Sequence, residues 1–166
     1  MGAMPEEAKG KTGVPSPTRQ KPRRPRDLLG RPLAWDATNE LTLEDFDSFT
    51  LERNHALGRQ YVREGRYFPA HEAWETAWKQ ARDTDDAEFF KGLSQMGAGY
   101  VHLLRGNAHG AITLLRRAAG RVGRYPVGHR GIATGALRDK LEADAARVER
   151  GAMVPGPDVE FVPPDV

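Results

Sequence analysis

The chain has 166 residues, a formal net charge of +2 and no cysteine. This length predicts about one domain with a sizeable core, and the lack of cysteine excludes disulfides, thiolate metal sites and a cysteine nucleophile. No apolar run approaches the roughly 18 residues of a membrane span, and the polar N-terminus lacks the apolar core of a signal peptide, so we expect a cytoplasmic protein with no membrane contact.

The basic charge is concentrated in residues 1–32, which carry eight Lys or Arg against three acidic residues, whereas residues 33–166 have a net charge of −3. This segment is rich in Pro and Gly and nearly free of large apolar side chains, so we expect a disordered basic tail. The run Lys21-Pro-Arg-Arg-Pro-Arg26 could make weak, phosphate-based contact with nucleic acid. The favoured interpretation is a solubilising or start-site extension.

Helical periodicity indicates an all-α domain over residues 33–150. An irregular arm of residues 33–45 should pack on it through Leu33, Trp35, Leu41 and Leu43. Asp45 or Asp47 is the expected N-cap of the first helix, and Gly65 its stop. The expected helices are Phe46–Glu64, Pro69–Arg82, Ala87–Arg105, Gly110–Arg124 and Thr134–Arg150, followed by an extended tail over residues 151–166 with four prolines.

The helix after Gly65 is the one around which the others should be arranged. Its Ala70, Ala77 and Ala81 form a small-residue stripe on which the first helix could pack closely. A neighbouring stripe holds larger and polar side chains, namely His71, Trp74, Glu75 and Trp78, with Glu72 at its edge. The third helix is apolar on more than one side, which is typical of a central helix. It also carries a narrow, mostly polar seam of Lys91, Gln95, Ala98 and His102, which we expect to face the polar stripe.

An internal repeat with a spacing of 41 residues relates the first two helices to the next two. Gly58, Tyr61, Gly65, Ala70, Trp74 and Ala77 correspond to Gly99, His102, Gly106, Ala111, Leu115 and Ala118. The order of small, ring, Gly, Ala, large and Ala resembles the tetratricopeptide unit, a helical hairpin of about 34 residues. Because only two units are present, we expect a compact bundle of two such hairpins plus a C-terminal helix.

A narrower resemblance is carried by three motifs in order: Gly65-x-Tyr67-Phe68-x-Ala70-His71-Glu72-x-Trp74-Glu75-x-x-Trp78, then Phe90-x-Gly92-Leu93-x-Gln95, then His102 with Gly106-Asn107-x-x-Gly110-Ala111. Over about residues 50–126 the chain is similar to the bacterial and archaeal family called domain of unknown function 309. The resemblance implies an all-helical fold and singles out His71, Glu72, Glu75, Gln95 and His102. It implies no reaction.

Several chemical roles are open to the polar residues. As a catalytic group, His71, Glu72, Glu75 and His102 could use pKa values shifted by burial for acid–base chemistry, with Gln95, Lys91 and Trp74 as binding residues. A metal site of His71, Glu75 and His102 is a further alternative. The zincin motif is not met, since Glu75 stands where its second His would be, and the Glu-x-x-His pairs of di-iron proteins are absent. We therefore expect no cofactor.

The leading interpretation is a structural or interaction module with a protein partner, in which the buried His, Glu and Gln side chains satisfy one another's hydrogen bonds and fix helix register. The alternatives are a small hydrolase-like or metal-assisted enzyme that uses the same cluster, and nucleic-acid contact through the basic tail. The remaining histidines, His55, His109 and His129, are expected to be ordinary surface or loop residues.

Overall fold

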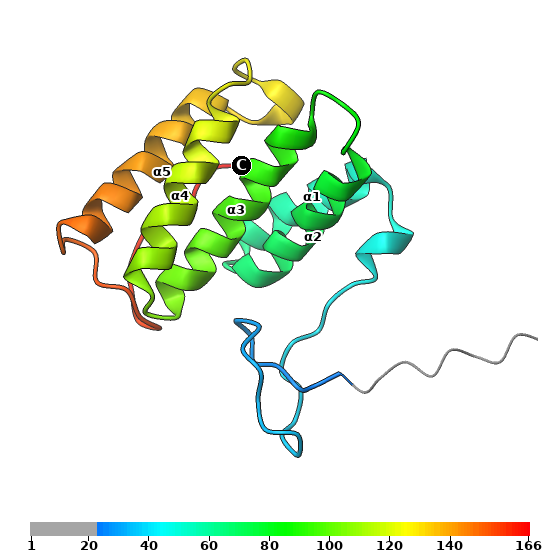
Figure 1. Cartoon of the computed structure of the whole chain (residues 1–166), viewed down its shortest axis with the longest axis vertical. Helices are drawn as coiled ribbons and strands as arrows, with labels where there is room; N and C mark the ends of the chain where they lie inside the picture. The colour runs from blue at the N-terminus through cyan, green and yellow to red at the C-terminus, as the bar shows by residue number, and fades with distance from the viewer. Residues whose placement is uncertain (1–22) are drawn as a thin grey trace, which may run out of the picture.

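The computed structural model describes residues 23–166, and the regular secondary structure of this part of the chain is helical (Figure 1). Its five α-helices confirm the predicted all-α bundle. They are α1 (Leu51–Arg63), α2 (Tyr67–Gln80), α3 (Ala87–Leu104), α4 (Ala108–Val122) and α5 (Thr134–Glu149), with two short 3-10 turns at Phe46–Ser48 and His129–Gly131. No helix in the described part of the chain is both long and apolar enough to cross a membrane.

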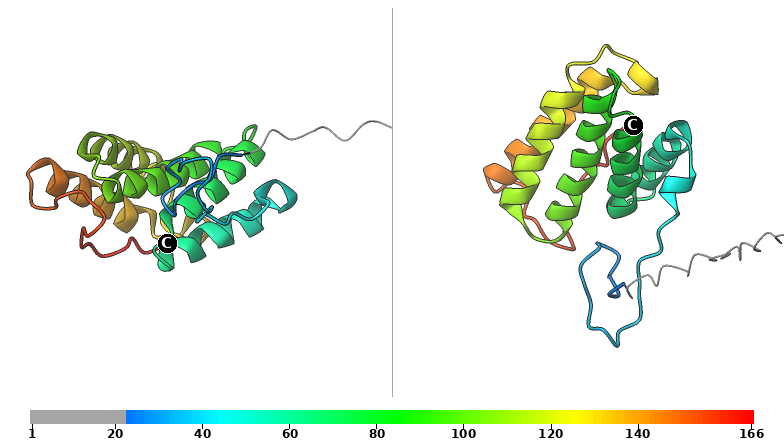
Figure 2. Two further views of the ribbon diagram at one scale, coloured as in Figure 1. Left: turned by 90° about the horizontal axis from the view of Figure 1, so that it is seen from below. Right: turned by 45° about the vertical axis from the view of Figure 1, so that its right-hand side comes forward.

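Each helix packs on the helices that precede and follow it in the sequence, so α3 lies in the middle between α2 and α4 (Figure 2). Its large apolar side chains are buried on several sides, as expected for a central helix: Phe89, Phe90, Leu93, Met96, Tyr100 and Leu103. This arrangement places the face of α2 that is turned away from α1 against α3.

The internal repeat corresponds to two equivalent helix contacts. A Cβ atom added at Gly58 of α1 would lie 2.4 Å from the Trp74 ring of α2, and one added at Gly99 of α3 would lie 2.8 Å from Leu115 of α4. In both hairpins the glycine therefore lets a large side chain of the next helix approach the backbone. The turns between the helices contain Gly65 at φ 71° and Gly106 at φ 80°, a conformation that residues with a Cβ rarely adopt.

The first residues of three helices differ from the sequence expectation, and the helices end one or two residues earlier than expected. The first helix begins at Leu51 rather than Phe46, because the Thr50 hydroxyl accepts a hydrogen bond from the Arg53 amide (3.2 Å) and residues 46–48 form a separate turn. The second begins at Tyr67, so Pro69 occupies its third position, where the missing amide needs no partner. The fourth begins at Ala108, since Asn107 caps it.

The N-terminal arm, which in the structure comprises residues 23–45, is a loop that projects beyond the helices (Figure 1). Residues 23–32, which the sequence assigns to the basic tail, form a hydrogen-bonded turn in which the Asp27 amide donates to Arg31 O (3.0 Å). Residues 1–22 lie outside the described residues, and the boundary between tail and domain stays a prediction. Leu41 of the arm is buried as expected. The expectation for Trp35 was wrong: its side chain is 65% exposed, because the chain turns away from the bundle at residues 34–37.

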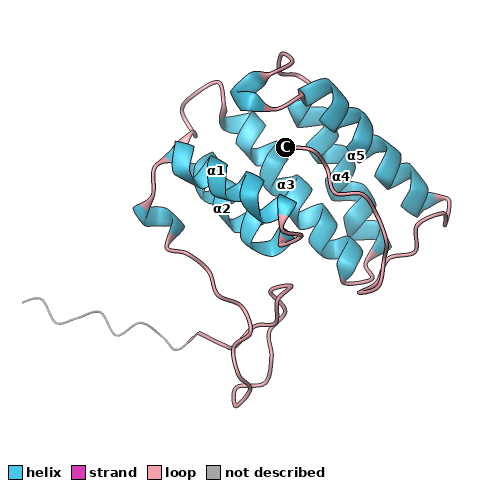
Figure 3. Cartoon of the chain, turned by 180° about the vertical axis from the view of Figure 1, so that it is seen from behind, coloured by secondary structure: helices cyan, strands magenta, loops and turns pink. Residues whose placement is uncertain are grey.

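The C-terminal segment after α5 has no regular structure, yet it covers part of the core. Figure 3 shows it running along one side of the bundle. The Phe161 ring stacks on Tyr100, with centroids 5.0 Å apart and an interplanar angle of 6°. The Gly156 amide donates a hydrogen bond to Leu103 O (2.9 Å), and Met153 is buried. These contacts attach the segment to α3.

Candidate functional site

The candidate site is built on His71, which lies where α2 approaches α3 most closely. A Cβ added at Gly97 of α3 would lie 2.9 Å from both the Cα and the amide nitrogen of His71, so glycine permits this contact. The Nδ1 atom of His71 is 3.0 Å from the Ser94 carbonyl oxygen of α3. Because a carbonyl only accepts hydrogen bonds, Nδ1 carries a proton, and Nε2 of the neutral ring carries a free lone pair.

Two carboxylates of the same helix lie beside that nitrogen. The Nε2 atom is 3.4 Å from Glu75 Oε2 and 3.7 Å from Glu72 Oε1. The other oxygen of Glu75 pairs with Lys79 Nζ at 3.0 Å. The ligand atoms of His71, Glu72 and Glu75 all lie within 4.8 Å of one another. The three side chains are between 24% and 34% exposed, so the group is open to solvent on one side.

His102 is a neighbour of this group rather than a member of it. It lines a small cavity of about 110 Å³ together with His71, Phe68 and Arg105. Burial lowers the pKa of His102, and the positive charge of Arg105 adds to the effect. Its Nδ1 atom lies 2.9 Å from the Asn107 side-chain nitrogen. His102 could therefore act on a small molecule near the site as a neutral imidazole, as a proton acceptor or donor.

The three expected binding residues make separate contacts. Trp74 is fully buried against α1, and its indole donates a hydrogen bond to His55 Nδ1 at 3.1 Å. The Lys91 ammonium lies 4.9 Å from the centroid of the Trp78 ring. The Gln95 side-chain oxygen is buried and has no hydrogen-bond partner in the part of the chain that the structure describes. Their roles in binding stay predictions.

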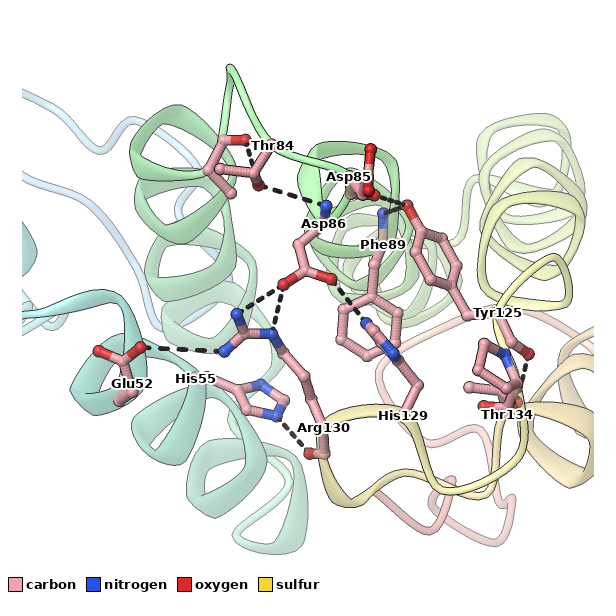
Figure 4. Close-up of polar contacts among 12 residues, drawn as sticks. Glu52, His55, Thr84, Asp85, Asp86, Phe89, Tyr125, His129, Arg130 and Thr134 are labelled. Atoms are coloured by element: carbon pink, nitrogen blue, oxygen red, sulfur yellow. Dashed lines mark hydrogen bonds and ion pairs between the residues drawn. The ribbon is translucent and has the colours of Figure 1, made fainter.

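A second polar cluster was missed by the sequence reasoning (Figure 4). Asp86, at the start of α3, accepts hydrogen bonds from His129 Nε2 (2.7 Å) and Arg130 Nε (2.7 Å). The Arg130 guanidinium also lies 5.1 Å from the centroid of the Phe90 ring. Burial alone would raise the pKa of Asp86, but the hydrogen bonds from Arg130 and His129 hold it below its usual value. This cluster attaches the α4–α5 connection to α3.

His55 extends the same cluster to α1 and α2. Its Nε2 atom donates to the Arg130 carbonyl oxygen (3.0 Å) while Nδ1 accepts from Trp74. Burial lowers the pKa of His55, since the charged ring would be desolvated. The expectation that His55 is an ordinary surface or loop residue was wrong, because it is buried on α1. His129 lies in the α4–α5 loop as expected, although it pairs with Asp86, and His109 is exposed as expected.

One signal could have indicated the burial of His55. It precedes Gly58 and Val62 by three and seven residues, which places it on the apolar face of α1. His129 has no comparable signal. Both ring nitrogens of His55 and both oxygens of Asp86 are occupied by protein partners, so this cluster is a structural link between helices and offers no open position for a ligand.

The molecule also has an apolar cavity of about 430 Å³ between the start of α2, the N-terminal arm and the C-terminal segment. Leu28, at its rim, is 67% exposed. Further walls are provided by Leu29, Leu41, Tyr67, Pro69, Leu104 and Pro157.

Comparison with known proteins supports the class indicated by the fold and the motifs. Residues 56–114 match the family model described as Domain of unknown function (DUF309). The match confirms the resemblance expected from the motifs, and the matched segment includes His71, Glu72, Glu75, Gln95 and His102. No curated protein and no solved structure matches the chain.

Proposed function

We propose that this protein is a helical module that binds one divalent transition-metal ion through His71, Glu72 and Glu75. The observation that carries the proposal is the position of His71 Nε2, a free lone pair that faces two carboxylates at 3.4 and 3.7 Å. One imidazole and two carboxylates form a ligand set that suits Zn²⁺, Mn²⁺ or Fe²⁺.

The separations suit an ion better than a direct contact. Hydrogen bonds between nitrogen and oxygen are about 2.7–3.2 Å long, and both distances exceed that range. Ligand atoms at about 2.0–2.1 Å from one tetrahedral ion lie about 3.3 Å from each other. Small adjustments of the two glutamates would therefore complete three corners of a tetrahedron, and solvent can reach the fourth.

The partner of the other ring nitrogen supports the same conclusion. Histidines that bind metals usually donate their second N–H to a carbonyl or carboxylate, which fixes the ring and the tautomer. His71 makes this bond to the Ser94 carbonyl of α3. The competing interpretation is a protonated His71 that pairs with the two glutamates and contributes only to stability. It is less favourable geometrically because the contacts are long, and Lys79 already pairs with Glu75.

The test is a calorimetric titration of metal-free protein with Zn²⁺ and, separately, Mn²⁺. We expect one ion per chain, and an affinity reduced at least tenfold in Glu75→Gln and His71→Gln, because each change removes a ligand. Glu142→Gln is the matched control, since Glu142 is an exposed glutamate on α5 that pairs with Arg116. Absence of binding by the wild type, or equal binding by Glu75→Gln and the control, would refute the proposal.

The apolar cavity favours a second candidate, the interaction module that the sequence first suggested. The lining carries one carboxylate, Glu40, and one guanidinium, Arg66, among mostly apolar side chains, so the partner we propose is an uncharged segment with leucine-sized side chains. Fluorescence anisotropy of a labelled leucine-containing peptide without charged side chains tests the idea. Binding should be lost in Leu28→Ser, a change at an exposed position, and unchanged binding would rule out this cavity.

Several finer expectations remain predictions: a bacterial origin, a cytoplasmic location, hairpins of the tetratricopeptide type, and nucleic-acid contact through the basic tail. The metal-assisted enzyme is also still open. A bound ion with one position for water would lower the pKa of that water and supply a nucleophile for hydrolysis. His102, beside His71 in the small cavity, is the group we would test as its acid or base.

A further inference from the structure

A second polar cavity, of about 360 Å³, adjoins the proposed metal site through Glu72. It lies between the N-terminal arm and α2. Its lining combines three guanidinium groups, one carboxylate and two apolar side chains: Arg23, Arg24, Arg26, Glu72, Leu43 and Phe68. The ionised side chains therefore have a positive sum, which favours an anionic ligand.

Two of the arginines are anchored by their own loop. Arg24 Nε donates a hydrogen bond to the Leu33 carbonyl oxygen (2.5 Å), and Arg26 Nη1 donates to Gly30 O (2.6 Å). A guanidinium has five N–H donors, so each keeps donors available after this bond. Among the described residues, Glu72 lies 3.7 Å from His71 Nε2 and forms no ion pair with the three arginines. Their charges are thus not neutralised by the nearest carboxylate.

We propose that this cavity binds a small phosphate ester. The phosphate would pair with Arg23 and Arg26, and an apolar or aromatic group would rest against Phe68 and Leu43. Guanidinium groups match the geometry of phosphate oxygens through paired hydrogen bonds. The volume is in the range of small-molecule sites, and the walls offer an apolar surface that a free inorganic ion would not use.

In one respect the inference rests on the proposed function. Glu72 contributes a negative charge to the cavity, and an ion bound by Glu72 would neutralise it. The affinity for a phosphate ester should therefore rise when the metal site is loaded. The arginines themselves do not depend on the metal, so the two ideas can be separated.

The experiment is a calorimetric titration of the full chain with phenyl phosphate, performed with metal-free protein and with protein loaded with Zn²⁺. The test variant is Arg23→Gln/Arg26→Gln. The matched control is Arg117→Gln, an exposed arginine on α4. Inorganic phosphate serves as the second ligand, and a single-stranded oligonucleotide serves as competitor.

We expect phenyl phosphate to bind the wild type and the control equally, and the double variant about tenfold more weakly or worse, since two charge-assisted pairs are lost. Inorganic phosphate should bind more weakly than phenyl phosphate. Loading with Zn²⁺ should tighten binding of the ester. Equal binding by the double variant and the wild type would overturn the proposal.

The other outcomes are also decisive. Weaker binding in the double variant with no effect of Zn²⁺ supports the cavity and overturns its link to the metal. If the wild type takes up no metal, the proposed function fails, and the metal-free titration alone decides on the cavity. Displacement of the ester by the oligonucleotide, with a salt dependence typical of several phosphate contacts, would show that the arginines contact a polynucleotide and would overturn the small-ligand assignment.

Discussion

The contact between Gly97 and His71 provides a sharp test of how α2 and α3 hold the site. In Gly97→Ala the new methyl group would lie 2.9 Å from two backbone atoms of His71, whereas ordinary contacts begin near 3.4 Å. The helices must therefore separate by about 0.5 Å, because backbone atoms cannot rotate away as a side chain can. Forcing extra volume into a packed interface costs about 1–3 kcal/mol.

The matched control is Gly120→Ala on α4, where an added Cβ meets nothing within 4 Å. Both substitutions gain the same helix propensity, about 1 kcal/mol, so the difference between them isolates the clash. We expect Gly97→Ala to be less stable than Gly120→Ala by about 1–3 kcal/mol in urea unfolding, or by roughly 2–4 °C in melting temperature for each kcal/mol.

The same variant has a second readout. Separation of the helices should weaken the hydrogen bond from His71 to Ser94, and loss of such a supporting bond typically lowers metal affinity by about 10–100-fold. If Gly97→Ala is as stable as Gly120→Ala, the close approach of α2 and α3 is not as described, and the reasoning about His71 fails with it.

Three further predictions concern the rest of the bundle. Burial lowers the pKa of His55 from its ordinary value of 6.5, so the contribution of the neutral ring to stability is complete above pH 6.5 and is lost as the pH falls below that value. In urea unfolding between pH 7.5 and 5, the free energy of unfolding of His55→Gln should therefore fall less steeply than that of the wild type. An unchanged slope would contradict this. Asp86→Asn should lower the free energy of unfolding by about 1–3 kcal/mol, since it weakens the hydrogen bonds to two cationic partners. The exposed control Asp139→Asn should change the free energy of unfolding by less than about 0.5 kcal/mol. Equal effects of the two variants in denaturation curves would argue against the cluster. Phe161→Ala should lower the free energy of unfolding by about 1–3 kcal/mol, because the C-terminal segment loses its aromatic contact with the core. The segment should also be cut more readily in limited proteolysis. An unchanged protease pattern would mean that other contacts hold the segment.

The two polar clusters have different physical characters. Both ring nitrogens of His55 and both oxygens of Asp86 have protein partners, and the cluster ties four parts of the chain together. Around His71 the contacts of Nε2 with the two glutamates are long, and solvent has access. Saturated networks stabilise a fold, whereas groups left incompletely paired near the surface are available to a ligand. This difference is the reason that we place the function on α2.

Much of the fold was determined by local features of the sequence. The apolar periodicity of α3 predicted a central helix, and the 41-residue repeat predicted two hairpins, because small residues at matching positions allow close helix packing. The position of His71, Glu72 and Glu75 on one helical face also follows from spacing alone. These features depend on residues that are near one another along the chain.

Only the tertiary structure decided which partners those residues meet. The proton on His71 Nδ1 follows from a carbonyl on α3, 23 positions further along the chain. His55 became a buried member and His129 a half-buried member of this network through contacts with residues 75 and 43 positions away. Trp35 became exposed because the arm turns away from the helices. Periodicity describes one element at a time, whereas such contacts depend on how all the elements pack together, and this packing determines which polar groups are satisfied and which remain open to a ligand.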